Sequence, residues 1–135
     1  MIFVDSNIPM YAAGNSSPQK EACLSFLKKI NDTKLDAASS AEVLQEILHR
    51  YHAIQRLMEG IKVYEAFRSL PIRWLEIVPD DVDYAKETLT IHPHMPSRDA
   101  IHLAVMHRNG IKKIATYDQD FLGIPTITVF LPEQV

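Results

Sequence analysis

Residues 97–118 read SRDAIHLAVMHRNGIKKIATYD, and this stretch decides the fold. The part up to Gly110 is long enough for a helix and is apolar on most sides, which predicts a buried helix. Ser97 stands where a helix cap is expected, and Gly110 stands where a helix ends. The apolar run Ile111–Thr116 then predicts a buried strand, which ends just before Asp118. A buried helix followed directly by a buried strand is typical of α/β proteins.

Strand and helix patterns alternate through the rest of the chain as well. This alternation predicts an α/β fold in which helices cover both faces of a central, mainly parallel sheet. The other expected strands are residues 2–4, 35–38, 72–78 and 126–130. The other expected helices run from Ser17 to Asn31, from the capping-box stretch Ser39-Ser40-Ala41-Glu42 through Tyr51, through Ile61 to Leu70 before Pro71, and from Asp80 to about Thr90. Residues 92–96 are expected to form a loop because they contain two prolines.

The composition is that of an ordinary globular protein. The 135 residues are 47% apolar and 23% charged, which suits one hydrophobic core, and we expect a single domain over residues 1–135. Cys23 is the only cysteine, so no intramolecular disulfide can form, and a reducing, cytoplasmic compartment fits best. The sequence shows neither a secretion signal nor an apolar run long enough to cross a membrane. The net charge of -3 argues against nucleic-acid binding through bulk electrostatics alone.

Acidic residues follow two of the expected strands. Asp5 comes directly after the first strand, and Asp118 follows the strand that ends at Thr116. Ligands of open parallel sheets bind beyond the carboxyl ends of the strands, so both carboxylates should face one crevice. Asp99, in the first turn of the buried helix, should lie near the same rim. Each position also has an ordinary explanation, because aspartate favours turns and the first turns of helices.

Glu46 is not selected by its position in the sequence. It lies beside Val43 and Arg50, at the margin of the apolar stripe of its helix. A solvated surface glutamate is the ordinary expectation there.

Four short motifs, taken in order, add a more specific signal. They are Val4-Asp5-Ser6-Asn7, then Ser39-Ser40 with Glu46-Ile47-Leu48, then Arg98-Asp99-Ala100-Ile101-His102-Leu103-Ala104, then Ala115-Thr116-Tyr117-Asp118-Gln119-Asp120-Phe121. In this order, and over essentially the whole chain, they resemble the PIN domain family and in particular its VapC-type toxins. The resemblance implies a three-layer α/β/α sandwich and a ribonuclease that uses three or four carboxylates with a divalent metal.

Carried over by motif, the resemblance assigns the catalytic and metal-binding acids. They are Asp5, Glu46, Asp99 and Asp118, and Asp120 competes with Asp118 for the fourth place.

The resemblance also assigns polar neighbours of these acids. Ser6, Asn7 and Thr116 match positions that support the acidic cluster, and Ser6 stands where the family commonly has threonine. Arg98 is the candidate for a phosphate contact, since it adjoins Asp99. The other candidates for substrate contact stay unassigned: His94, Arg50 and Arg73.

Carboxylates suit Mg²⁺ or Mn²⁺, which favour oxygen ligands, and we expect no histidine or cysteine ligand from the four motifs. The expected nucleophile is a metal-activated water, and the metal would stabilise the charge that develops on the phosphate. By resemblance, the products are a 5′-phosphate and a 3′-hydroxyl. The resemblance also implies an RNA substrate, a homodimer, and inhibition by a small antitoxin protein.

Other functions fit the sequence less well. A dehalogenase-type phosphatase requires a second aspartate where this chain has Asn7. His92 and His94 could suggest a zinc site with Asp99, but a third and a fourth ligand at suitable spacing are missing. A PIN-like fold that acts in RNA processing, or that only binds RNA or protein, is the alternative that the sequence leaves open.

Overall fold

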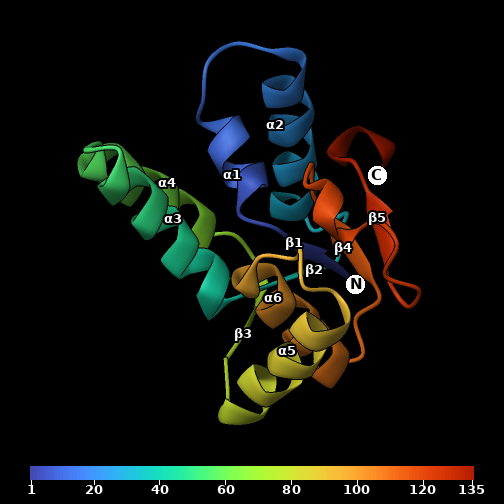
Figure 1. Ribbon diagram of the computed structural model, residues 1–135. Coiled ribbons are helices and arrows are strands. Elements are labelled where there is room, and N and C mark those ends of the chain that lie inside the picture. Colours follow the sequence, from blue (N-terminus) through green and yellow to red (C-terminus); the bar gives the residue numbers. More distant parts are fainter.

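The computed structural model describes residues 1–135, and a five-stranded sheet lies at its centre (Figure 1). The strand order is β3-β2-β1-β4-β5, and every neighbouring pair is parallel. The strands are β1 (Ile2–Val4), β2 (Ala37–Ser40), β3 (Arg73–Leu75), β4 (Lys113–Ala115) and β5 (Thr128–Phe130). The prediction of a central parallel sheet is confirmed.

Helices cover both faces of this sheet. They are α1 (Asn7–Ala12), α2 (Pro18–Asn31), α3 (Ala41–Ala53), α4 (Leu57–Arg68), α5 (Pro79–Ile91) and α6 (Ser97–Arg108), with short 3-10 turns η1 (Gln119–Phe121) and η2 (Pro132–Gln134). The chain steps outward from β1 through β2 to β3 and then returns past β1 to β4. Because such crossovers are right-handed, the reversal of direction places the returning helices on the other face. Accordingly, α5 and α6 lie on the opposite side of the sheet from α1 and α2 (Figure 1).

The core forms where α6 and the central strands meet. Phe3 and Val4 of β1 have no exposed surface, and neither has Ile114 of β4. Helix α6 is buried from Ala100 to Met106 except at the half-buried Ile101, which confirms the buried helix predicted from its composition. Gly110 ends this segment with a φ of 69°, a left-handed conformation that glycine adopts without strain. No helix combines the length and apolar character that crossing a membrane requires.

Several predicted element boundaries were wrong. The strand expected over residues 72–78 is limited to Arg73–Leu75, because α5 begins at Pro79, before the predicted start at Asp80. The strand expected over 35–38 is instead Ala37–Ser40, since β2 pairs with β1 from Ala37 onward. Helix α1 was not expected at all; it is too short to show a periodic pattern.

The helix caps also differ in detail from those predicted. Ser40, rather than Ser39, caps α3, since its hydroxyl accepts a hydrogen bond from the Val43 amide. The Ser39 hydroxyl instead donates to the Val4 carbonyl oxygen at 2.9 Å and so ties β2 to β1. Ser97 is the first residue of α6 and makes no capping hydrogen bond. Ser17 caps α2 as predicted, by accepting from the Lys20 amide.

Strand β1 lies between β2 and β4, at the point where the chain reverses its direction across the sheet. The carboxyl ends of parallel strands border a crevice at such a point, and ligands of open α/β sheets bind there. The fold therefore places the residues that follow β1 and β4 at the edge where a site is expected.

Candidate active site

Asp5 follows β1 directly and is held by three hydrogen-bond donors. Its carboxylate accepts from the Ser6 amide at 2.7 Å, the Thr116 hydroxyl at 2.7 Å and the Asn7 side-chain amide at 3.3 Å. The Asn7 amide also donates to the Thr116 hydroxyl oxygen at 3.0 Å, which links the end of β1 to the residue after β4. Asp5 is only 2% exposed, so these donors replace the water it would otherwise bind.

Glu46 lies in the same cluster and is 8% exposed. The Ser6 hydroxyl donates to its Oε2 at 2.6 Å. The surface position that the helical pattern favoured for Glu46 is therefore wrong. The reason is tertiary, because α6 packs against α3 and covers this side of it.

Asp99 joins the cluster from the first turn of α6 and is 7% exposed. Its carboxylate and those of Asp118 and Asp120 have oxygens within 4.8 Å of one another. The Asp118 carboxylate accepts from the Asp120 amide at 2.9 Å, and the Asp118 amide donates to the Thr116 hydroxyl oxygen at 2.9 Å. Both Asp118 and Asp120 thus face Asp99, and the geometry keeps both as candidates for the fourth acid.

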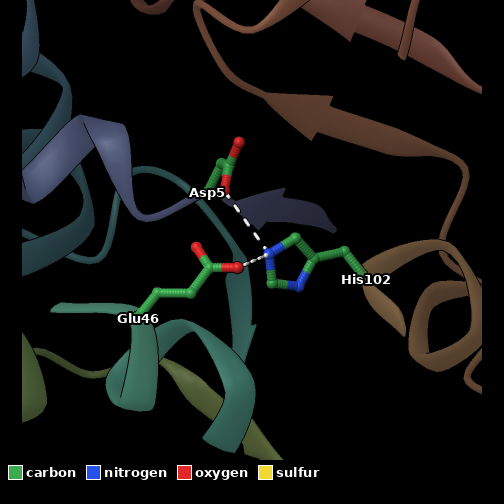
Figure 2. Close-up of side chains that lie close together, drawn as sticks. All are labelled: Asp5, Glu46 and His102. Carbon is green, nitrogen blue, oxygen red and sulfur yellow. Dashed lines mark ion pairs between the residues drawn. The ribbon is translucent and has the colours of Figure 1, made fainter. Parts of the chain in front are cut away.

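His102 is the residue that the sequence analysis missed. Its Nε2 lies 2.9 Å from Glu46 Oε1 and 3.6 Å from Asp5 Oδ1, with the ring directed toward both carboxylates (Figure 2). The four motifs were expected to contribute no histidine ligand, but the third motif brings the His102 side chain into the cluster. A signal was present, because residues three apart share a helix face and His102 is three residues after Asp99.

Burial and mutual repulsion shift the pKa values of the acids. Burial raises the pKa of Asp5 above its usual range, against the opposing effect of His102. Burial and the nearby charges of Asp5 and Asp118 raise the pKa of Asp99 to about 8. A site that disfavours ionised carboxylates in this way lacks positive charge.

Protonated His102 supplies part of the positive charge that the carboxylates require. Burial acts to lower its pKa, but Glu46 and Asp5 outweigh burial and raise the pKa to about 8. Burial likewise acts to raise the pKa of Glu46, and the contacts with His102 and Ser6 outweigh it, so that this pKa is lowered. His102 and Glu46 therefore stabilise each other's charged forms.

The cluster also fits a divalent metal ion. Asp99 Oδ2 is buried and has no hydrogen-bond partner, and the buried Glu46 Oε1 has only its ion pair with His102. Buried polar atoms are rarely left without a hydrogen bond, and a cation would satisfy both carboxylates. Two groups of side chains have ligand atoms close enough together to hold an ion: Asp5, Glu46 and His102, and Asp99, Asp118 and Asp120.

Arg98 lies at the rim of the cluster, half-buried and without an ion pair. Its charge acts to lower the pKa of Glu46, which shows that it is close to the acids. The unassigned candidates are exposed: Arg50, Arg73 and His94. Neither His92 nor His94 is grouped with Asp99 as a metal ligand, so the zinc alternative gains no support.

Comparisons with known proteins agree with this geometry. The family model for the PIN domain matches residues 2–126. Ribonuclease VapC13 of Mycobacterium tuberculosis is 37% identical to this chain over 127 residues, which covers 94% of this chain and 97% of the relative.

Solved structures share the fold. The Mycobacterium tuberculosis toxin VapC20, described as cleaving the sarcin-ricin loop, has a TM-score of 0.73 at 21% identity and covers 90% of this chain and 92% of its own. VapBC2 from Rickettsia felis, solved with a DNA fragment from its promoter, has a TM-score of 0.74 at 16% identity and covers 97% of this chain and 98% of its own.

Proposed function

The chain belongs to the PIN domain family, and from this premise we propose that it is a VapC-type endoribonuclease in which the acidic cluster binds Mg²⁺ or Mn²⁺. The observation that carries the proposal is the gathering of carboxylates from four separate segments at the carboxyl ends of β1 and β4, three of them buried: Asp5, Glu46 and Asp99. The buried carboxylate oxygens that lack a hydrogen bond, on Glu46 and Asp99, support a bound cation. A module that only binds RNA or protein has no need for such an arrangement.

Each residue of the site has a separate role. Asp5, Glu46 and Asp99, together with Asp118 or Asp120, hold the metal. The hydrogen bonds from Ser6, Asn7 and Thr116 orient the Asp5 and Glu46 carboxylates. When bound, the metal supplies the positive charge that activates water and stabilises the phosphate during cleavage. Arg98 has no partner within the protein and contacts the RNA phosphate from the rim.

The test is an RNA cleavage assay with Mg²⁺ or Mn²⁺. Asp5→Asn and Asp99→Asn should each abolish cleavage, because each substitution removes a charged metal ligand. Asp83→Asn is the matched control, since Asp83 is exposed on α5 and makes no hydrogen bond or ion pair. Cleavage that persists at the wild-type rate in both site variants would refute the assignment.

The fourth acid can be assigned in the same assay. We propose Asp118, because it is less exposed than Asp120 and is positioned by the Thr116 hydroxyl. Asp118→Asn should then impair cleavage more than Asp120→Asn does. The reverse order would assign the role to Asp120.

We further propose that the chain is the toxin of a toxin–antitoxin pair and forms a homodimer. The similarity to VapC ribonucleases and the shared fold with VapBC assemblies support this role. Expression of the chain alone should arrest growth, and co-expression of a small protein encoded beside it should restore growth. Light scattering of the purified chain should give a mass of about twice 15.4 kDa.

A further inference from the structure

His102 is the basic side chain buried in the acidic cluster, and the proposed function gives it no role. It has no exposed surface and lies on the same face of α6 as Asp99. The Phe3 ring packs against its imidazole, with the ring centroids 5.5 Å apart. Packing therefore holds the imidazole in place beneath the site.

The Nε2 atom of this ring points into the gap between two carboxylates. It is 2.9 Å from Glu46 Oε1 and 3.6 Å from Asp5 Oδ1 (Figure 2). When the ring is protonated, Nε2 and Glu46 Oε1 form an ion pair, but their contact lacks the geometry of a hydrogen bond, and Nδ1 has no hydrogen-bond partner either. When the ring is neutral with its proton on Nδ1, the Nε2 lone pair would face the Glu46 oxygen without a donor between them, and a cation beside the two atoms would satisfy both.

The chemistry of the donors identifies that cation as a metal ion. The ligand atoms of Asp5, Glu46 and His102 all lie within 4.8 Å of one another, and they come from three different segments. Carboxylates suit both Mg²⁺ and Mn²⁺, but an imidazole nitrogen favours transition metals, so of these two ions Mn²⁺ accepts it more readily than Mg²⁺ does.

We propose that His102 Nε2 is a metal ligand that, together with Asp5 and Glu46, makes this site prefer Mn²⁺ to Mg²⁺. The inference rests on the proposed function only in requiring that this cluster binds a metal. The competing role for His102 is to position Glu46 through a direct contact, without touching the metal.

Pulsed electron paramagnetic resonance of the Mn²⁺-loaded full chain distinguishes these two roles. A directly bound imidazole produces a ¹⁴N coupling to the Mn²⁺ electron spin. We expect this coupling in the wild type and in His107→Gln, which alters an exposed histidine on the same helix. It should be lost in His102→Gln, in which the amide can still contact Glu46. A bound Mn²⁺ without ¹⁴N coupling in the wild type would overturn the proposal, even if the variant does not fold.

Metal affinity gives a second measurement. By calorimetric titration, His102→Gln should weaken Mn²⁺ binding by at least ~10-fold and Mg²⁺ binding by less. Equal losses for the two ions, or no loss for either, would show that His102 only positions Glu46. Nitrogen coupling in a protein that does not cleave RNA would leave this inference standing and refute the proposed function. A wild type that binds Mg²⁺ but no Mn²⁺ would refute this inference alone, and a wild type that binds neither ion would refute both.

Discussion

At the scale of single residues, the site depends on small polar side chains as much as on the acids. Ser6 contacts two of the buried carboxylates, since its amide donates to Asp5 and its hydroxyl donates to Glu46. Thr116 links Asp5 to the start of the segment that carries Asp118. The Ser6 hydroxyl fixes the Glu46 carboxylate and the Thr116 hydroxyl fixes the Asp5 carboxylate, and the backbone of the sheet supplies neither of these hydrogen bonds.

Ser6→Ala tests this role. The substitution removes the 2.6 Å hydrogen bond to Glu46 and leaves that carboxylate oxygen buried without a donor. We expect a loss of roughly 10–100-fold in RNA cleavage, as is typical when a group that orients a metal ligand is removed. Single-turnover cleavage rates measure the loss. Ser6→Thr retains the hydroxyl and should keep most of the activity, and equal losses in the two variants would contradict a role for the hydrogen bond.

At the scale of elements, the position of Glu46 depends on how α3 packs. Helix α3 pairs closely with α4, and Gly60 of α4 lies against Tyr51 of α3. A Cβ atom at position 60 would lie 2.4 Å from Tyr51 Cβ, closer than van der Waals contact allows. The close pairing of the two helices therefore requires glycine at this point.

Gly60→Ala sets two effects against each other. Alanine raises helix propensity, which alone would stabilise α4 by about 1 kcal/mol. The clash with Tyr51 forces the helices apart, and overpacking of this kind costs about 1–3 kcal/mol. We expect the clash to dominate and the free energy of unfolding, measured in urea, to fall. A more stable variant would show that α3 and α4 are not packed this closely.

The elements also show what the sequence could and could not predict. The buried helix α6, the alternation of strands and helices, and the loop at 92–96 follow from local pattern, and the structure contains all three. Helix α1 escaped prediction because it is a single short segment without a capping side chain. The spacing of apolar residues along a helix can be recognised in a sequence only when the helix has several turns.

The local pattern failed to select Glu46 and His102 for a different reason. Their roles depend on α6 crossing α3, a contact between segments far apart in the sequence. The helical pattern around Glu46 describes only its own helix, so it favoured solvent where α6 lies. The family resemblance identified Glu46, whereas the spacing of His102 from Asp99 acquired meaning only with the distances between the side chains.

At the scale of the whole molecule, concentrating acids at one edge of the sheet opposes folding. Burial and repulsion raise the pKa of Asp99 from its ordinary value of 3.8 to about 8. Asp99 ionises in the unfolded chain at a lower pH than in the folded protein, so the folded protein loses stability as the pH rises from 3.8 to 8. The raised pKa of His102 acts in the same direction. Its stabilising contribution is fully present below 6.5 and is lost as the pH rises through about 8.

The metal-free protein should therefore become less stable between pH 6.5 and 8. Thermal melting in EDTA at several pH values measures the decline. Asp99→Asn removes the destabilising effect of Asp99 and leaves that of His102. It should therefore raise the melting temperature, and the rise should be larger at pH 8 than at pH 5.5. A gain that does not depend on pH would show that ionisation of Asp99 is not the cause.

A bound metal should reverse this loss of stability, because it binds the folded cluster and not the unfolded chain. At a Mn²⁺ concentration 100 times the dissociation constant, mass action predicts about 2.7 kcal/mol of stabilisation, which corresponds to a rise of roughly 10 °C in melting temperature. Asp5→Asn should lose most of this rise, whereas Asp83→Asn, with the same change of charge on an exposed part of α5, should retain it. An equal rise in both variants would place the stabilising ion elsewhere on the molecule. A rise confined to proteins with Asp5 intact would tie the metal to the cluster that the sheet assembles.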